Sequence, residues 1–276
     1  MMRIGRIPYI NCYPVYGALD RGVVKLDAQL VDGVPTDLNR RMAVGELDIS
    51  VVSAVEYARD SERYLLLPDL AISCDGPVRS VMLFSARPAS DLGGRRVIVS
   101  RSSMTSVALL ELLFEHVWHV KPHFVPGDAE LSDVAVQDDG GADARLVIGD
   151  AALLLGSRHK SRYNHSYDLG QEWKQWTGQP FVFAVWVAQR TANVKEALIA
   201  HSALIESRNW GLDHLPELAR QAREATGVEE SVCAEYLSGL DYGLSYPHLA
   251  GLTEFYRRLV ERGRIPNGTL TFLPAA

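Results

Sequence analysis

Asn11 is the first side chain of the sequence whose type and place suggest ligand binding. It stands in the segment Arg-Ile-Pro-Tyr-Ile-Asn-Cys-Tyr-Pro over residues 6–14, among mostly apolar and aromatic neighbours. The segment lies where a first strand should pass into a first helix. Ligands of open α/β sheets bind beyond the carboxyl ends of the strands, so a polar side chain at this point predicts a binding site.

Small polar residues recur at the starts of later predicted helices. They are Ser53, Ser103, Thr105, Ser106, and Asp150 following Gly149. Helix starts carry unpaired backbone N–H groups and the positive end of the helix dipole, so hydroxyls there can complete a site for an anion. Plain helix capping explains such residues equally well. If these helix starts face one crevice, they predict an anion-binding cleft.

Ser80 lies within an apolar, strand-like stretch over residues 78–84. The alternation of side chains along a strand places Ser80 on one face with Val78 and Met82. A serine in a hydrophobic strand is usually a satisfied core hydroxyl. Beside a cleft it becomes a hydrogen-bond donor to a substrate, and both interpretations stay open at this point.

Motifs of nucleotide, metal or nucleophilic chemistry are not visible. The sequence has no G-x-G-x-x-G, P-loop, H-E-x-x-H or Ser-His-Asp signature. Cys12 stands where a helix start could activate a thiol, but no histidine is paired with it in the sequence. His116, His119 and His123 are near one another, yet the first two alternate with apolar residues around a helix end. The residues therefore give no support to nucleotide-dependent chemistry and little to a metal site.

The composition indicates an ordinary globular protein. Its 276 residues are 47% hydrophobic and 22% charged, which suffices for one large or two moderate cores. The net charge of −6 disfavours nucleic acid as a partner, because such binding needs a basic field. No run approaches the roughly 18 apolar residues of a membrane span, and the N-terminus lacks the pattern of a signal peptide. Three widely separated cysteines favour reduced thiols, so we expect a cytoplasmic protein.

Strand-like and helix-like stretches alternate along the chain, which is typical of an α/β fold. A first series ends near residue 86, a second begins with a strand at 96–100, and four predicted helices fill the C-terminal part from 194 to 262. The apolar stretches around 80–88 and 181–188 are natural crossings between two lobes. We expect one lobe from residues 1–86 plus 188–276, a second from 87–187, and a substrate cleft between them. A single doubly wound domain is the alternative.

The ordered motifs resemble a known family of enzymes. The opening segment is similar to Y-[LI]-N-x-x-P, the start of the chorismate dehydratases of the futalosine pathway to menaquinone. Further similar motifs follow in order over residues 1 to 190: Leu47-Asp48, Ser53-x-x-Glu56-Tyr57, Val78-x-Ser80-Val81, Ser103-x-Thr105-Ser106, Ile148-Gly149-Asp150, Asp168-Leu169-Gly170 and Pro180-Phe181-Val182-Phe183. The sister enzyme, 1,4-dihydroxy-6-naphthoate synthase, resembles S-P-C-P-N-D-T-F at its start, and this chain departs from that pattern.

The resemblance implies a two-lobed, periplasmic-binding-protein-like (type II) fold with a hinge of two crossing strands. It implies conversion of chorismate to 3-[(1-carboxyvinyl)oxy]benzoate and water without a cofactor. Asn11 and Ser80 would take the catalytic positions. The substrate would be bound by Ser53 of the first lobe and by residues of the second lobe, namely Ser103, Thr105, Ser106, Gly149 and Asp150. The substrate's own enolpyruvyl carboxylate is a plausible proton acceptor, with Asp150 as the alternative. The sister synthase and a non-catalytic carboxylate-binding protein stay open as other functions.

Overall fold

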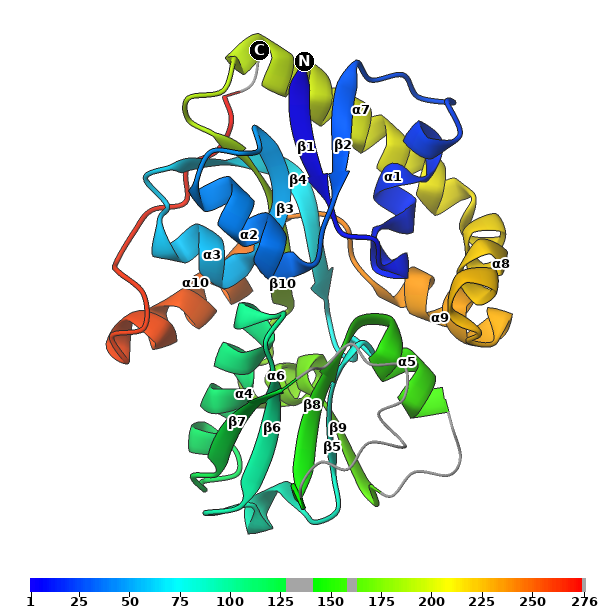
Figure 1. Ribbon diagram of the computed structural model, residues 1–276. Helices are drawn as coiled ribbons and strands as arrows, with labels where there is room; N and C mark the ends of the chain where they lie inside the picture. The colour runs from blue at the N-terminus through cyan, green and yellow to red at the C-terminus, as the bar shows by residue number, and fades with distance from the viewer. Residues whose placement is uncertain (128–140, 158–162, 275–276) are drawn as a thin grey trace.

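Two five-stranded sheets, each flanked by helices, form the two lobes of the protein (Figure 1). The structure is a computed structural model, and it describes residues 1–127, 141–157 and 163–274. The first sheet has the strand order β2-β1-β3-β10-β4 and the second the order β7-β6-β8-β5-β9. The strands are β1 (Met2–Arg6), β2 (Ala28–Asp32), β3 (Ile49–Ser53), β4 (Tyr64–Cys74), β5 (Val81–Ser85), β6 (Arg96–Ser100), β7 (His123–Gly127), β8 (Ala144–Ile148), β9 (His165–Asp168) and β10 (Phe181–Gln189).

The strand β10 lies within the first sheet although it follows the strands of the second sheet in the sequence. Strands β1, β2 and β3 are parallel to one another, and β10 lies antiparallel between β3 and β4. Its residues form a continuous apolar run, as a strand buried on both faces requires. In the second sheet β6 is parallel to β7 and β8, and β5 is antiparallel to β8 and β9.

The helices pack against both sheets, and the last four return to the first lobe (Figure 1). They are α1 (Tyr13–Asp20), α2 (Pro35–Ala43), α3 (Ala54–Arg59), α4 (Met104–His116), α5 (Gly149–Ser157), α6 (Leu169–Thr177), α7 (Val194–Asp213), α8 (Leu215–Thr226), α9 (Glu230–Gly239) and α10 (Tyr246–Glu261). Two short 3-10 helices, η1 (Ile10–Cys12) and η2 (Ala89–Asp91), complete the set. Within the described ranges no helix combines the length and the apolar character that a membrane crossing needs.

The chain passes between the sheets at residues 75–80 and 178–180. The second passage is held by the indole of Trp173, which donates to the Pro180 carbonyl at 3.1 Å, and by Gly251 of α10. A Cβ on Gly251 would come within 2.0 Å of that carbonyl oxygen, so only glycine fits there. The first passage carries Ser80 and is described with the site.

Both passages lie a few residues before the apolar stretches that the sequence suggested as crossings. Those stretches are β5 and β10, because strongly apolar strands are buried within sheets while short polar segments connect them. A division by sheet membership therefore falls at 75–80 and 178–180. The lobe boundaries at 86/87 and 187/188 stay a prediction.

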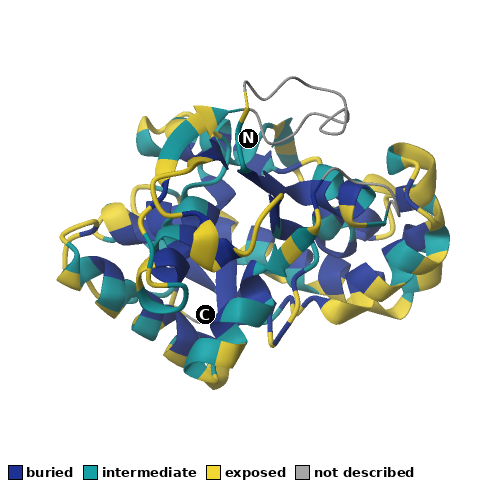
Figure 2. Ribbon diagram, turned by 90° about the horizontal axis from the view of Figure 1, so that it is seen from below, coloured by how far each residue is buried: buried dark blue, intermediate teal, exposed yellow. Residues whose placement is uncertain are grey.

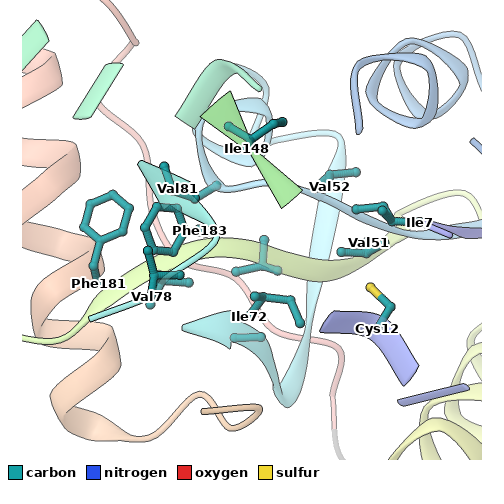
Figure 3. Close-up of a cluster of buried hydrophobic side chains, with 14 of the residues drawn as sticks. Ile7, Cys12, Val51, Val52, Ile72, Val78, Val81, Ile148, Phe181 and Phe183 are labelled. Atoms are coloured by element: carbon teal, nitrogen blue, oxygen red, sulfur yellow. The ribbon is translucent and has the colours of Figure 1, made fainter. Parts of the chain in front are cut away.

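One large cluster of buried apolar side chains extends through both lobes. Buried residues follow the strands of each sheet, and exposed residues cover the outer faces of the helices (Figure 2). Close to the passages, Val81 and Ile148 of the second sheet lie in the same cluster as Val52 and Phe183 of the first (Figure 3). The two lobes are therefore in contact in this structure.

Candidate active site

Asn11 lies in η1, directly after β1 and before α1. Its neighbours Ile10 and Cys12 are fully buried and anchor the turn in the core of the first lobe. The side-chain oxygen Oδ1 of Asn11 is itself buried and has no hydrogen-bond partner among the described residues. Leaving a buried polar atom unpaired costs about 1–3 kcal/mol, so this oxygen is available to a ligand that can donate a hydrogen bond.

Ser80 ends the first passage between the lobes and is only 3% exposed. Its carbonyl oxygen accepts from the backbone N–H of Gly149 at 2.8 Å, which joins Ser80 to the start of α5. Its hydroxyl oxygen accepts a hydrogen bond from the hydroxyl of Tyr236 in α9, also at 2.8 Å. Ser80 is thus fixed by one contact from the second lobe and one from the C-terminal helices.

The carboxylate of Asp168 holds the backbone just before Ser80. It accepts from the N–H groups of Val78 at 3.0 Å and Arg79 at 2.6 Å, and it also caps α6. Arg79 has φ +61°, a left-handed conformation that is unfavourable for a residue with a Cβ. Burial raises the pKa of Asp168, although the backbone N–H groups oppose that effect. The carboxylate therefore stabilises the backbone turn that sets the position of Ser80.

Gly149 and Asp150 bring the start of α5 against η1. Gly149 has φ +63°, and a Cβ there would lie 3.3 Å from the ring of Tyr9 in the first lobe. Asp150 accepts a hydrogen bond from the backbone N–H of Ile10 at 3.3 Å, so its carboxyl group lies beside the residue that precedes Asn11. Burial raises the pKa of Asp150 to about 6. Asp150 is therefore the carboxyl group of this site that can hold a proton near neutral pH.

Electrostatic effects connect the residues of this site with the C-terminal helices. Burial raises the pKa of Cys12 and Tyr236, and the negative charge of Asp150 raises both further. The hydroxyl of Tyr242 is buried and, like Asn11 Oδ1, has no partner in the described part of the chain. The sequence reasoning did not find Tyr236 or Tyr242, because nothing local distinguishes them from other buried tyrosines.

The other predicted residues form a second group where α3 and α4 start. Ser53 caps α3 and accepts from the side-chain amide of Asn39 at 3.0 Å. Ser103 caps α4 and donates to the hydroxyl of Ser106 at 2.7 Å. The hydroxyl of Thr105 accepts from the backbone N–H of Val55 at 3.1 Å, across the lobes. The capping interpretation therefore holds for Ser53 and Ser103.

Both polar groups border the same apolar surface. Val52 precedes Ser53, Ile148 precedes Gly149 and Val81 follows Ser80. Figure 3 shows these three apolar residues, together with Cys12, in one cluster between the lobes. No hydrogen bond joins Asn11, Ser80, Gly149 or Asp150 to the group of Ser53, Ser103, Thr105 and Ser106 within residues 1–127, 141–157 and 163–274.

A cavity of about 360 Å³ opens beside the second group, lined by Ser103, Arg59 and Arg101 among others. Another, of about 380 Å³, lies between α3, α10 and residues 265–270, and none of the predicted site residues lines it. The chemistry is therefore assigned from the buried polar groups between the lobes and not from these cavities.

Comparison with known proteins places the chain in a family. A model of the family described as "Menaquinone biosynthesis" matches residues 2–261. The chain belongs to this family. A chorismate dehydratase of Thermus thermophilus is 32% identical to this menaquinone biosynthesis protein, over 93% of the chain and 94% of the relative. A chorismate dehydratase of Campylobacter jejuni is 29% identical over 71% of the chain and 72% of the relative.

Solved structures confirm the two-lobed fold of this member of the menaquinone biosynthesis family. A protein of Archaeoglobus fulgidus matches with a TM-score of 0.77 and 21% identity, over 96% of this chain and 98% of the other. The periplasmic aliphatic sulphonate binding protein of Escherichia coli matches with a TM-score of 0.64 and 14% identity, over 98% and 94%. The predicted periplasmic-binding-protein-like fold is thus confirmed, while the roles of the individual site residues stay predictions.

Proposed function

We propose that the chain is a chorismate dehydratase, which converts chorismate to 3-[(1-carboxyvinyl)oxy]benzoate and water in menaquinone biosynthesis. The observation that carries the proposal is its 32% identity, over 93% of its length, to a protein named chorismate dehydratase. The unpaired buried oxygen of Asn11 supports it, because the same segment carries the resemblance to these enzymes. The protein contributes a closed, largely apolar site with a few fixed polar groups.

The reaction needs little help beyond placement. Chorismate loses a ring hydroxyl and the hydrogen on the neighbouring ring carbon, and the ring becomes aromatic. The product is strongly favoured for that reason. Positioning, exclusion of water and acid–base assistance of roughly 10²–10⁴-fold are what the protein has to supply. The apolar contact between the lobes in this structure suits such a site.

Asn11 and Ser80 are the proposed catalytic residues. The buried Oδ1 of Asn11 accepts a hydrogen bond from the ring hydroxyl and holds it in the direction in which it leaves. Ser80, at the end of the first passage between the lobes, donates a hydrogen bond to the substrate. Both side chains are neutral, so neither repels a dianion. Together they orient the two groups that leave the ring.

The substrate's enolpyruvyl carboxylate is the proposed proton acceptor. Asp150 accepts from the backbone N–H of Ile10, next to Asn11, and burial raises its pKa to about 6. An ionised carboxylate beside a dianion is unfavourable, so substrate binding favours the protonated form of Asp150. A protonated carboxyl group cannot take a proton from the ring, and the carboxylate of the substrate is then the base. The carboxyl group that forms passes this proton to the departing hydroxyl, which leaves as water, and the carboxylate is restored.

The remaining residues are proposed to bind the carboxylates of the substrate. They are Ser53, Ser103, Thr105, Ser106, Gly149 and Asp150. The start of α4 supports this role, because the hydroxyls of Ser103 and Ser106 and the backbone N–H of Ser106 lie together at the positive end of the helix dipole. Thr105 acts chiefly in closure, since its hydroxyl already accepts from Val55 across the lobes.

The deciding experiment is an ultraviolet assay with chorismate and no added cofactor. Appearance of the aromatic enol ether supports the dehydratase, and binding without turnover would assign a carboxylate-binding protein. Absence of both, with turnover of a later pathway intermediate, would assign the sister synthase. Ser80→Ala and Asn11→Ala should each lower kcat by about 10²–10⁴-fold. Near-wild-type rates in both variants would remove these residues from the chemistry.

The cytoplasm is the proposed compartment. Cys12, Cys74 and Cys233 are all buried free thiols, which suits a reducing environment. The lobe division at 86/87 and 187/188 is proposed for the hinge, and limited proteolysis of the ligand-free protein tests it. Cleavage confined to the interior of either lobe would contradict that division.

A further inference from the structure

The C-terminal helix α9 holds the first passage between the lobes at two successive residues. Glu235 forms an ion pair with Arg79, and Tyr236 donates a hydrogen bond to Ser80 at 2.8 Å. The ion pair is exposed to solvent and contributes little stability. The hydrogen bond is different, because Tyr236 is 1% exposed and Ser80 is 3% exposed. A buried hydrogen bond between two hydroxyls fixes the direction of both.

The hydrogen bond runs from the phenol of Tyr236 to Ser80 Oγ, as expected because a phenol is the more acidic hydroxyl and therefore the better donor. Burial and the charge of Asp150 raise the pKa of Tyr236 well above its ordinary value, so the phenol keeps its proton. A buried O–H donor needs an acceptor, and in the described residues the acceptor is Ser80 Oγ. A serine hydroxyl has one proton and two lone pairs. Once Tyr236 donates to Ser80, the proton of Ser80 has to point elsewhere.

Nothing among the described residues accepts that proton. The backbone of Ser80 is already engaged, since its carbonyl accepts from Gly149 and its N–H donates to Val78. The only hydrogen bond of its hydroxyl in the described ranges is the one it accepts from Tyr236. The hydroxyl therefore has a donor that no described residue uses, at the passage where the two lobes meet.

We propose that Tyr236 is a positioning residue that makes Ser80 an obligatory hydrogen-bond donor toward the substrate. The proposal rests on the proposed function for the identity of the substrate oxygen, which belongs to the departing hydroxyl or the enolpyruvyl carboxylate. It also gives the C-terminal helices a role in the site. Tyr236 does not touch the substrate and acts through Ser80 alone.

A double-mutant cycle tests this dependence. Tyr236→Phe removes one oxygen and keeps the ring, so packing is retained. It should lower kcat about five- to tenfold with KM within twofold, the size expected for one hydrogen bond. In the Ser80→Ala background the same substitution should change kcat by less than twofold, with product measured by chromatography over hours. An unchanged kcat for Tyr236→Phe, or an equal fall in both backgrounds, would overturn the proposal.

The matched control is Tyr57→Phe. Tyr57 is as buried as Tyr236, and its hydroxyl bonds the backbone of Thr269 and Thr271, away from the passage. This variant should lose stability and keep the wild-type kcat. A similar fall in kcat for Tyr57→Phe would mean that any buried tyrosine hydroxyl has the effect, which also contradicts the proposal.

A second readout does not depend on turnover. High-resolution crystal structures of the wild type and of Tyr236→Phe should show Ser80 in one rotamer in the first and in a different or mixed rotamer in the second. The same single rotamer in both would overturn the proposal. If the wild type does not convert chorismate, the proposed function fails, and this comparison still decides the role of Tyr236.

Discussion

Gly149→Ala should separate lobe closure from folding. Gly149 has φ +63°, and a left-handed backbone costs a residue with a Cβ about 1–2 kcal/mol. In addition, the new Cβ would lie 3.3 Å from two ring carbons of Tyr9, closer than the 3.5–4.0 Å of an optimal carbon contact. Overpacking of this kind costs about 1–3 kcal/mol, and the lower half of that range applies because Tyr9 is only partly buried. Only the state with the lobes in contact pays this second cost.

The matched control is Gly227→Ala. Gly227 caps α8 with φ +71°, and a Cβ there meets nothing within 4 Å. Both variants should lose about 1–2 kcal/mol of stability, or roughly 2–4 °C in Tm for each kcal/mol. Only Gly149→Ala should also lower kcat/KM, by about 5–30-fold, because about 1–2 kcal/mol opposes closure.

Calorimetric unfolding and the ultraviolet assay measure the two effects on the same samples. Equal kcat/KM values for Gly149→Ala and Gly227→Ala would refute the reasoning, since the contact between Gly149 and Tyr9 would then have no part in forming the active state. A larger stability loss in Gly227→Ala would contradict the backbone argument instead.

Three further predictions follow from buried groups. Asp150→Asn should raise the free energy of unfolding at pH 7.5 by up to about 2–3 kcal/mol and have little effect at pH 4, because a carboxyl group with a pKa raised to about 6 destabilises the folded protein as pH rises from about 4 through 6. A pH-independent difference in urea unfolding would contradict this. A 100-fold fall in kcat would instead make Asp150 the base. Asp168→Asn should lower the free energy of unfolding by about 1.5–3 kcal/mol, since an amide offers one acceptor oxygen to the N–H groups of Val78 and Arg79; unchanged urea unfolding would contradict this. Cys12 should resist iodoacetamide at pH 7.5 in the native protein, because burial raises its pKa, and rapid labelling would show an exposed thiolate.

Local patterns in the sequence predicted the elements that carry a strong apolar signal. The strand at residues 96–100 agrees with β6 in both bounds, and the apolar run at 181–188 is β10. The pattern could not reveal β9, whose residues His165–Asp168 are partly exposed at the edge of the second sheet. The apolar pattern also did not predict helix α6, which follows β9 directly.

The sequence predicted site residues that stand in distinctive local segments, and it did not predict residues that only the fold brings to the site. Asn11 was recognisable because it stands at a strand–helix junction within a distinctive segment. Tyr236 was not, because 156 positions separate it from Ser80 and its own helix reads as ordinary. Asp168 was noticed only as part of a motif, since its contact with Val78 spans 90 positions. Residues of this kind become visible only when the topology is known.

The place of β10 has a consequence for synthesis on the ribosome. Strand β4 emerges early, yet its partner within the sheet is β10, which emerges more than a hundred residues later. The strands of the second sheet lie consecutively between them and can pair as soon as they leave the exit tunnel. The second sheet can thus form while β4 is still without its partner, and the apolar surface of β4 remains a target for chaperones until β10 emerges.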